Sequence, residues 1–206
     1  MRGGGCATLV AVALATAGCT TTVAGTPSAV SGLAMASAAP PLPFAPTIAE
    51  RWNRRNDGTS FEPCIAYSAN EALALGMDPR TLEDAAISDS PNYRGCHWEL
   101  TRRDGDSRGR WWNWVSQIVG NQPPLTSYKA SHHEYAWVSD RFVDGRTFAL
   151  GNRRTTQSVE CYVVFTSGTA LVGTAVNFET ASRRTQAEEC DRAFRIAALA
   201  ASKAPR

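Results

Sequence analysis

Six cysteines carry the clearest chemical signals in this chain of 206 residues. Cys19 directly follows Ala17 and Gly18, the arrangement in which a bacterial lipoprotein presents the thiol that is diacylated and becomes the new N-terminus. Arg2 and a short apolar run over residues 7–17 precede it, in the order of a secretory signal. The sequence therefore predicts export and lipidation at Cys19.

The apolar run is too short to cross a membrane, since a spanning helix needs roughly 18 apolar residues. We expect residues 1–18 to be a removable lipoprotein signal peptide. Thr16 stands where such signals usually carry Leu, and the alternative is an ordinary signal peptide cut nearby, with Cys19 as a spare thiol. Acyl chains bind a lipid bilayer with about 0.8 kcal/mol per buried methylene, so two or three of them on Cys19 would anchor the protein firmly.

Four cysteines remain once Cys6 leaves with the signal, and an even number in an exported domain predicts two disulfides. They are Cys64, Cys96, Cys161 and Cys190. Four cysteines allow three pairings. Metal binding is the alternative, but the sequence has no CxxC motif and export favours oxidation.

The expected pairing follows from which cysteines point towards the core. Alternation along a strand places Cys161 on one face with Val163 and Phe165. Helical spacing places Cys190 on one face with Phe194. We therefore predict a Cys161–Cys190 bridge between the sheet and a helix.

The second pairing follows in the same way. Cys96 shares a strand face with Trp98 and Leu100, which leaves Cys64, just ahead of the first predicted helix, as its partner. Each bridge would close a loop of about 30 residues, worth on the order of 3–4 kcal/mol in the chain-entropy model.

A run of tryptophans and arginines is the candidate binding site. Trp111 and Trp114 lie on a predicted strand, and Arg108 and Arg110 lie just before it. An exposed tryptophan beside arginine would stack on a sugar or enter a pocket of a partner. The alternative is that these tryptophans belong to the core or to cation–π packing on the surface.

Motifs for enzymatic chemistry are missing from the sequence: it has no nucleophile elbow, P-loop, dinucleotide-binding glycine pattern or zinc-protease motif. Adjacent His132 and His133 would point in different directions, so we expect no metal site there. We expect no catalytic residue and no cofactor. The alternative is a hydrolase whose carboxylates or hydroxyls meet only in the fold.

The charge balance is close to neutral and says little about partners. The formal net charge is +2, and loss of Arg2 with the signal leaves +1. Such a balance gives no field to attract nucleic acid. Four arginine pairs, the last of them Arg183-Arg184, are expected on the solvated surface.

Composition divides the chain into three parts. After residues 1–18, residues 19–59 are rich in Thr, Ala, Ser, Gly and Pro, and we expect a flexible tether that reaches about 35 Å. Residues 60–202 are expected to form one disulfide-bonded domain. Its predicted elements are helices at 68–76, 126–133 and 181–200, strands at 95–101 and 111–119, and hairpins at 135–150 and 158–178.

This order of elements predicts an α+β fold, in which a single, largely antiparallel sheet has helices packed on it. Capping signals support the first helix, since Ser68 stands three residues before Glu71. Asp144-Gly145 is typical of the two-residue turn of a hairpin.

Several landmarks carry a family resemblance. They are Cys19-Thr-Thr-Thr-Val-Ala-Gly-Thr-Pro27, Pro63-Cys64, Gly95-Cys96-His97-Trp98, Cys161 and Cys190-Asp191-Arg192-Ala193. In order and spacing the chain resembles a family of actinobacterial, mycobacterial-type envelope lipoproteins with a secreted domain of unknown function. The resemblance implies a membrane-anchored extracytoplasmic domain without an established catalytic role.

We therefore expect a non-enzymatic binding or scaffold lipoprotein on the extracytoplasmic face of the cell membrane. It would be a monomer, attached to the lipid bilayer through acylated Cys19. Its partner would be an envelope glycolipid, a polysaccharide or a protein. The alternatives are a cell-envelope hydrolase and a structural surface antigen.

Overall fold

The computed structural model describes residues 41–85, 91–102 and 113–206. All of them belong to one compact unit, Ala39–Arg206. The expected signal peptide and Cys19 lie outside the described residues, so the lipid anchor stays a prediction.

The described residues form one antiparallel sheet of eight strands. The strands run in the order β1-β2-β3-β8-β7-β6-β4, with β5 paired to β6. Their bounds are β1 Glu83–Asp84, β2 Arg94–Glu99, β3 Trp114–Gly120, β4 Ala136–Trp137, β5 Arg141–Val143, β6 Arg146–Arg154, β7 Ser158–Ser167 and β8 Ala170–Glu179. The predicted α+β fold class is confirmed.

Tight turns explain why neighbouring strands pair. Asp144 and Gly145 both adopt a positive φ, of 49° and 76°, and so form the turn between β5 and β6. Gly168, with a φ of 56°, turns the chain between β7 and β8. Glycine takes these angles without the steric cost that a side chain would add.

Within residues 41–85, 91–102 and 113–206, three α-helices and two short 3₁₀ helices accompany the sheet. Their bounds are η1 Pro63–Ile65, α1 Ala69–Ala74, η2 Pro79–Thr81, α2 Leu125–Ser131 and α3 Gln186–Lys203. Capping boxes begin two of them, Ser68 with Glu71 at α1 and Thr185 with Glu188 at α3. No helix in the described part of the chain combines the length and the apolar character needed to cross a membrane.

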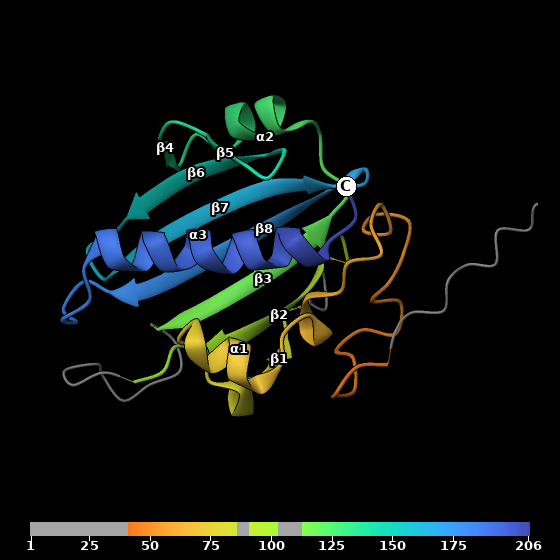
Figure 1. The fold of residues 1–206 in the computed structure, drawn as a ribbon, viewed down its shortest axis with the longest axis horizontal. Helices are drawn as coiled ribbons and strands as arrows, with labels where there is room; N and C mark the ends of the chain where they lie inside the picture. Colours follow the sequence, from red (N-terminus) through yellow and green to blue (C-terminus); the bar gives the residue numbers. More distant parts are fainter. Residues whose placement is uncertain (1–40, 86–90, 103–112) are drawn as a thin grey trace, which may run out of the picture. The chain divides into compact units, whose positions relative to one another are not determined.

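Helices cover both faces of the sheet. The longest helix, α3, lies across one face (Figure 1), over the buried side chains of Val159, Val163 and Phe165. On the other face, Tyr128 of α2 packs against Val164. Strand β7 is therefore buried on both sides.

Both predicted disulfides are present. Cys64–Cys96 joins η1 to β2 with a Cα–Cα distance of 5.3 Å. Cys161–Cys190 joins β7 to α3 with a Cα–Cα distance of 4.9 Å. The pairing predicted from the inward-facing positions is confirmed.

The first strand of the hairpin expected over residues 135–150 is interrupted. Strands β4 and β5 both pair with β6, but the pairing is broken at Ser139 and Asp140. The Asp140 carboxylate there forms an ion pair with Lys129 of α2 at 2.7 Å. Between the two paired stretches, residues 138–140 lie opposite residues 149–150, so this strand carries one extra residue and forms a bulge.

The domain begins before the boundary expected at residue 60. Leu42 and Phe44 pack against the main core, and Arg51 is only 4% exposed. Arg51 forms ion pairs with Glu62 at 2.8 Å and with Asp84 at 3.0 Å. Residues 42–59 thus lie against the domain and do not form a free tether. Their Pro-rich composition had predicted a tether.

Candidate binding site

One residue of the predicted tryptophan–arginine site, Trp114, belongs to the described part of the chain. Trp111, Arg108 and Arg110 lie outside the described residues. Trp114 begins β3, is half-buried beside the cluster under α2, and has its ring centre 6.4 Å from that of His97. For Trp114 this is partial core packing, and the site as a whole stays a prediction.

A different feature, a groove along one side of α3, brings charged and apolar residues together. The helix lines this groove with residues spaced three or four apart, which share one helical face. Ala187 and Cys190 line a cavity near the N-terminal end of the helix, Ala198 and Ala201 line another near its C-terminal end, and Phe194 lies between these pairs on the same face. We call this feature the α3 groove.

The opposite side of the α3 groove is formed by β6 and β5. Arg146, Phe148 and Leu150 of β6 face the helix, because side chains of a strand alternate between its faces. Arg141 and Val143 of β5 pair with Phe148 and Arg146 and so share that face. The groove is thus built by a helix stripe and by alternate residues of two strands.

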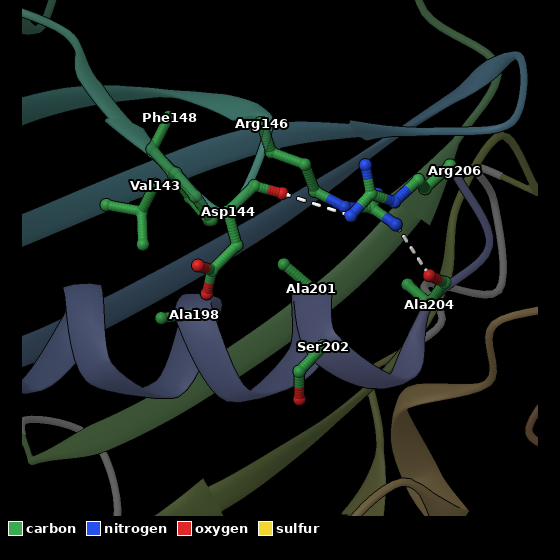
Figure 2. Close-up of a pocket in the computed structure, with 9 residues that line it drawn as sticks. All are labelled: Val143, Asp144, Arg146, Phe148, Ala198, Ala201, Ser202, Ala204 and Arg206. Carbon is green, nitrogen blue, oxygen red and sulfur yellow. Dashed lines mark hydrogen bonds between the residues drawn. The ribbon is translucent and has the colours of Figure 1, made fainter.

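Two arginines meet at the C-terminal end of α3, where they border a cavity of about 300 Å³ (Figure 2). Arg146 donates hydrogen bonds from Nη1 to the backbone oxygen of Thr166 at 2.8 Å and from Nη2 to that of Ala204 at 2.6 Å. Arg206 Nη2 donates to the backbone oxygen of Asp144 at 3.3 Å. Main-chain oxygens thus orient both guanidinium groups.

Within the described residues no carboxylate forms an ion pair with either arginine. The Asp144 carboxylate points towards α3 instead (Figure 2). Partial burial lowers the pKa of Arg146, and the neighbouring charge of Arg206 lowers it further. An anion between the two groups would relieve this repulsion, and guanidinium groups match the oxygens of carboxylate and phosphate.

A second cavity, of about 520 Å³, lies at the N-terminal end of the same helix. Its lining is mostly apolar and includes Val138, Leu150, Val163 and the Cys161–Cys190 disulfide. Both cavities have the size of sites that bind small molecules.

Arg141 lines this second cavity, as does the charged side chain of Asp191. Its guanidinium carbon is 4.5 Å from the centre of the Phe194 ring, which packs edge-on against Phe148 at 5.4 Å. The Arg141 side chain is exposed, and its guanidinium group forms no hydrogen bond or ion pair with the described residues. Among the described residues, this contact with the Phe194 ring is therefore the interaction that holds the Arg141 guanidinium group.

A tyrosine cluster joins α2 to the other face of the sheet. The hydroxyls of Tyr128 and Tyr162 are 2.9 Å apart, and Tyr135 donates to Glu160 at 2.5 Å. Burial raises the pKa of Tyr128 to about 12. In the described part of the chain every buried side-chain polar atom has a partner, so packing explains this cluster.

One of the arginines expected on the surface is buried. Arg184 is 6% exposed and pairs with Glu189 at 3.1 Å, and Glu189 also binds Arg192 at 2.7 Å. Arg192 in turn donates to the backbone oxygen of Leu75, so this network fastens α3 to the end of α1. The prediction that Arg184 is solvated is therefore wrong. A charged side chain can be buried when it has a partner of opposite charge, and Glu189 of α3 is that partner.

At one place in the described residues, side chains of the kinds that bind metal ions lie close together. They are Glu62, Cys64 and Cys96. The two sulfurs are bonded to each other and are not free thiolates. Glu62 is bound by Arg51 and Arg94, at 2.8 and 3.1 Å. This donor set does not fit a metal ion.

Sequence reasoning missed the α3 groove, although one signal for it was present. Alternation from Arg146 through Phe148 to Leu150 places an arginine on the inner face of a predicted strand. An inward arginine requires a partner or a ligand. Nothing in the sequence indicated that Arg206 would join it.

These features define an α+β domain with two disulfides and one groove that is basic at one end. The chain belongs to a family described as a protein of unknown function (DUF3558), whose model matches residues 14–203. Comparison with curated proteins found no match. The domain of unknown function expected from the resemblance is confirmed, while its envelope-lipoprotein character stays a prediction.

Proposed function

We propose that this protein is an exported, lipid-anchored binding protein without catalytic activity, and that the basic end of the α3 groove binds an anionic envelope component. Two disulfides support export, because such bonds persist mainly in oxidising compartments. The Ala17-Gly18-Cys19 sequence supports the lipid anchor.

The observation that carries the binding proposal is the arginine pair. Arg146 and Arg206 point their guanidinium groups to the same cavity, and both use backbone oxygens rather than carboxylates as partners. Their positive charge is thus left for a ligand. Carboxylate or phosphate groups of a glycolipid or of an acidic polysaccharide have the complementary charge and geometry.

The hydrolase alternative has less support. Buried carboxylates of the described residues are engaged inside the protein: Glu62 and Glu189 by arginines, and Glu160 by Arg153 and Tyr135. A general acid and a general base need carboxyl groups that reach a substrate. The surface-antigen alternative predicts that no ligand binds the groove.

A titration with inorganic phosphate tests the proposal. The exported chain carries Cys19→Ala, so that no acyl group of its own enters the cavity, and calorimetry measures the dissociation constant. We expect saturable binding that Arg206→Ala weakens at least ten-fold. Arg206 contributes a single hydrogen bond of 3.3 Å to the fold, so this variant is expected to remain folded.

Arg183→Ala is the matched control, because Arg183 is exposed and precedes the opposite end of α3. It removes the same charge and should change the phosphate affinity less than two-fold. Absence of phosphate binding, or equal loss in both variants, would overturn the proposed site.

A further inference from the structure

We infer that the ligand of the α3 groove is a single-chain amphiphile: its anionic head group lies between Arg146 and Arg206, and its hydrocarbon chain follows α3 into the apolar cavity. This inference rests on the proposed function and adds the chemical class of the ligand.

The two cavities lie along the same side of α3, one towards each end of the helix. Ala187 and Cys190 line the apolar cavity, Ala198 and Ala201 line the basic one, and Phe194 lies between them. All five belong to one helical face. A ligand that follows this face therefore passes from the basic cavity into the apolar one.

The chemistry of the lining changes along this track. At the basic end two guanidinium groups lack carboxylate partners among the described residues. At the other end the lining is mostly apolar, and Val138 on its outer wall is 50% exposed. One charged end and one apolar end are the two requirements of an amphiphile, and a hydrocarbon chain would cover Val138 from water.

The length of the track fits an ordinary acyl chain. From Ala201 to Cys190 the helix rises about 16.5 Å at 1.5 Å per residue, which is the length of an extended chain of about fourteen carbons. The chain is single because one face of one helix, with β5 and β6 opposite, provides one track.

Arg141 is the residue that must move. It lines the apolar cavity and stacks on Phe194, and its guanidinium group forms no hydrogen bond or ion pair with the described residues. A cation–π contact at an exposed site contributes about 0.5–1 kcal/mol. An incoming chain can replace this contact with its own packing on the Phe194 ring.

The test is a series of alkyl phosphates, from inorganic phosphate through butyl and octyl to dodecyl phosphate, titrated below their micelle concentrations into the full chain with Cys19→Ala. A fully buried methylene strengthens binding about four-fold. We expect the dissociation constant to fall at least one hundred-fold from butyl to dodecyl phosphate. Dodecanol, which lacks the anion, should bind at least ten-fold more weakly than dodecyl phosphate.

Ala187→Trp separates the two ends of the groove. Ala187 is exposed on α3, so the indole would fill the apolar cavity without disturbing the core. We expect the increase in affinity from butyl to dodecyl phosphate to be at least ten-fold smaller in this variant than in the parent. The affinity for inorganic phosphate should be unchanged. Ala187→Ser, which keeps the cavity open, should retain the gain.

Three results would overturn the inference. The first is an affinity that does not increase with chain length, and the second is the same increase in affinity along the series for Ala187→Trp and Ala187→Ser. The third is dodecanol binding as tightly as dodecyl phosphate. In each of these cases the proposed function still stands if inorganic phosphate binding depends on Arg206. Loss of that dependence is instead the failure of the proposed function itself.

Discussion

The guanidinium group of Arg146 donates a 2.6 Å hydrogen bond to the backbone oxygen of Ala204, the residue that caps the C-terminus of α3. One side chain of β6 therefore fastens the end of the helix and also borders the groove. Arg206 reaches back to the β5–β6 turn through Asp144, so strand and chain end hold each other in place. The proposed anion site is thereby held in one geometry without a ligand, which would reduce the entropy lost on binding.

The Cys161–Cys190 bridge is expected to contribute substantially to stability. It joins residues separated by 29 positions, a loop whose closure is worth about 3–4 kcal/mol in the chain-entropy model. Urea unfolding of a variant with Cys161→Ala and Cys190→Ala should show a free energy of unfolding lower by about 3 kcal/mol. A variant as stable as the parent would contradict this account of the bridge.

The N-terminal segment is predicted to be part of the fold. A chain that begins at residue 60 lacks Arg51 and leaves Glu62 with one partner fewer in a buried site. Loss of one partner of a buried ion pair costs about 3–5 kcal/mol. Thermal unfolding should therefore show a large loss of stability for this chain and little loss for a chain that begins at residue 41. If both chains were equally stable, the domain would begin at residue 60, as the sequence predicted.

Glu71 links α1 to α3 in a pH-dependent way. The hydrogen bond from Lys203, followed by the bonds from Ser68, lowers the pKa of the Glu71 carboxyl from near 4.5 to about 2. Because the folded-state pKa lies below the unfolded one, this contribution to stability is complete above pH 4.5 and is lost as the pH falls towards 2.

Carbon-13 NMR of the Glu71 carboxyl during a pH titration measures this shift. Lys203→Met should move the midpoint upwards from about 2 towards 4.5. Arg195→Met is the control, since Arg195 pairs with Asp191 instead. An unchanged midpoint in Lys203→Met would show that Lys203 is not the main cause.

Lipidation of Cys19 is predicted for the protein isolated from its native membrane. Mass spectrometry should find a mature chain that begins at Cys19 with an acylated thiol. In cells that carry Cys19→Ala, the protein should leave the membrane fraction, because the acyl chains supply its affinity for the bilayer. A free thiol at Cys19 in membrane-bound protein would argue for a different anchor.

Local signals in the sequence were sufficient for much of the fold. Ser68 and Glu71 marked the start of α1, and Asp144-Gly145 marked the β5–β6 turn, because caps and turns depend on a few neighbouring residues. The disulfides were predictable because alternation in β7 and helical spacing in α3 turned Cys161 and Cys190 towards the same core.

Contacts between distant residues were not predictable in this way. Arg206 donates a hydrogen bond to Asp144, which lies 62 positions away in the sequence. Arg51 donates one to Asp84, which lies 33 positions away. Such contacts depend on the three-dimensional path of the chain, and composition gave the opposite indication for the Pro-rich segment that contains Arg51. The α3 groove is built from contacts of this kind, which is why its arginine pair was missed.

The most direct test of the groove is a phosphate titration monitored through the arginine Nε–H signals in nitrogen-15 NMR. The signals of Arg146 and Arg206 should shift together and saturate with one common dissociation constant, while the signal of Arg183 stays in place. Signals of all three arginines that drift in parallel without saturation, or no shift at Arg146 and Arg206, would contradict an anion site at the end of α3.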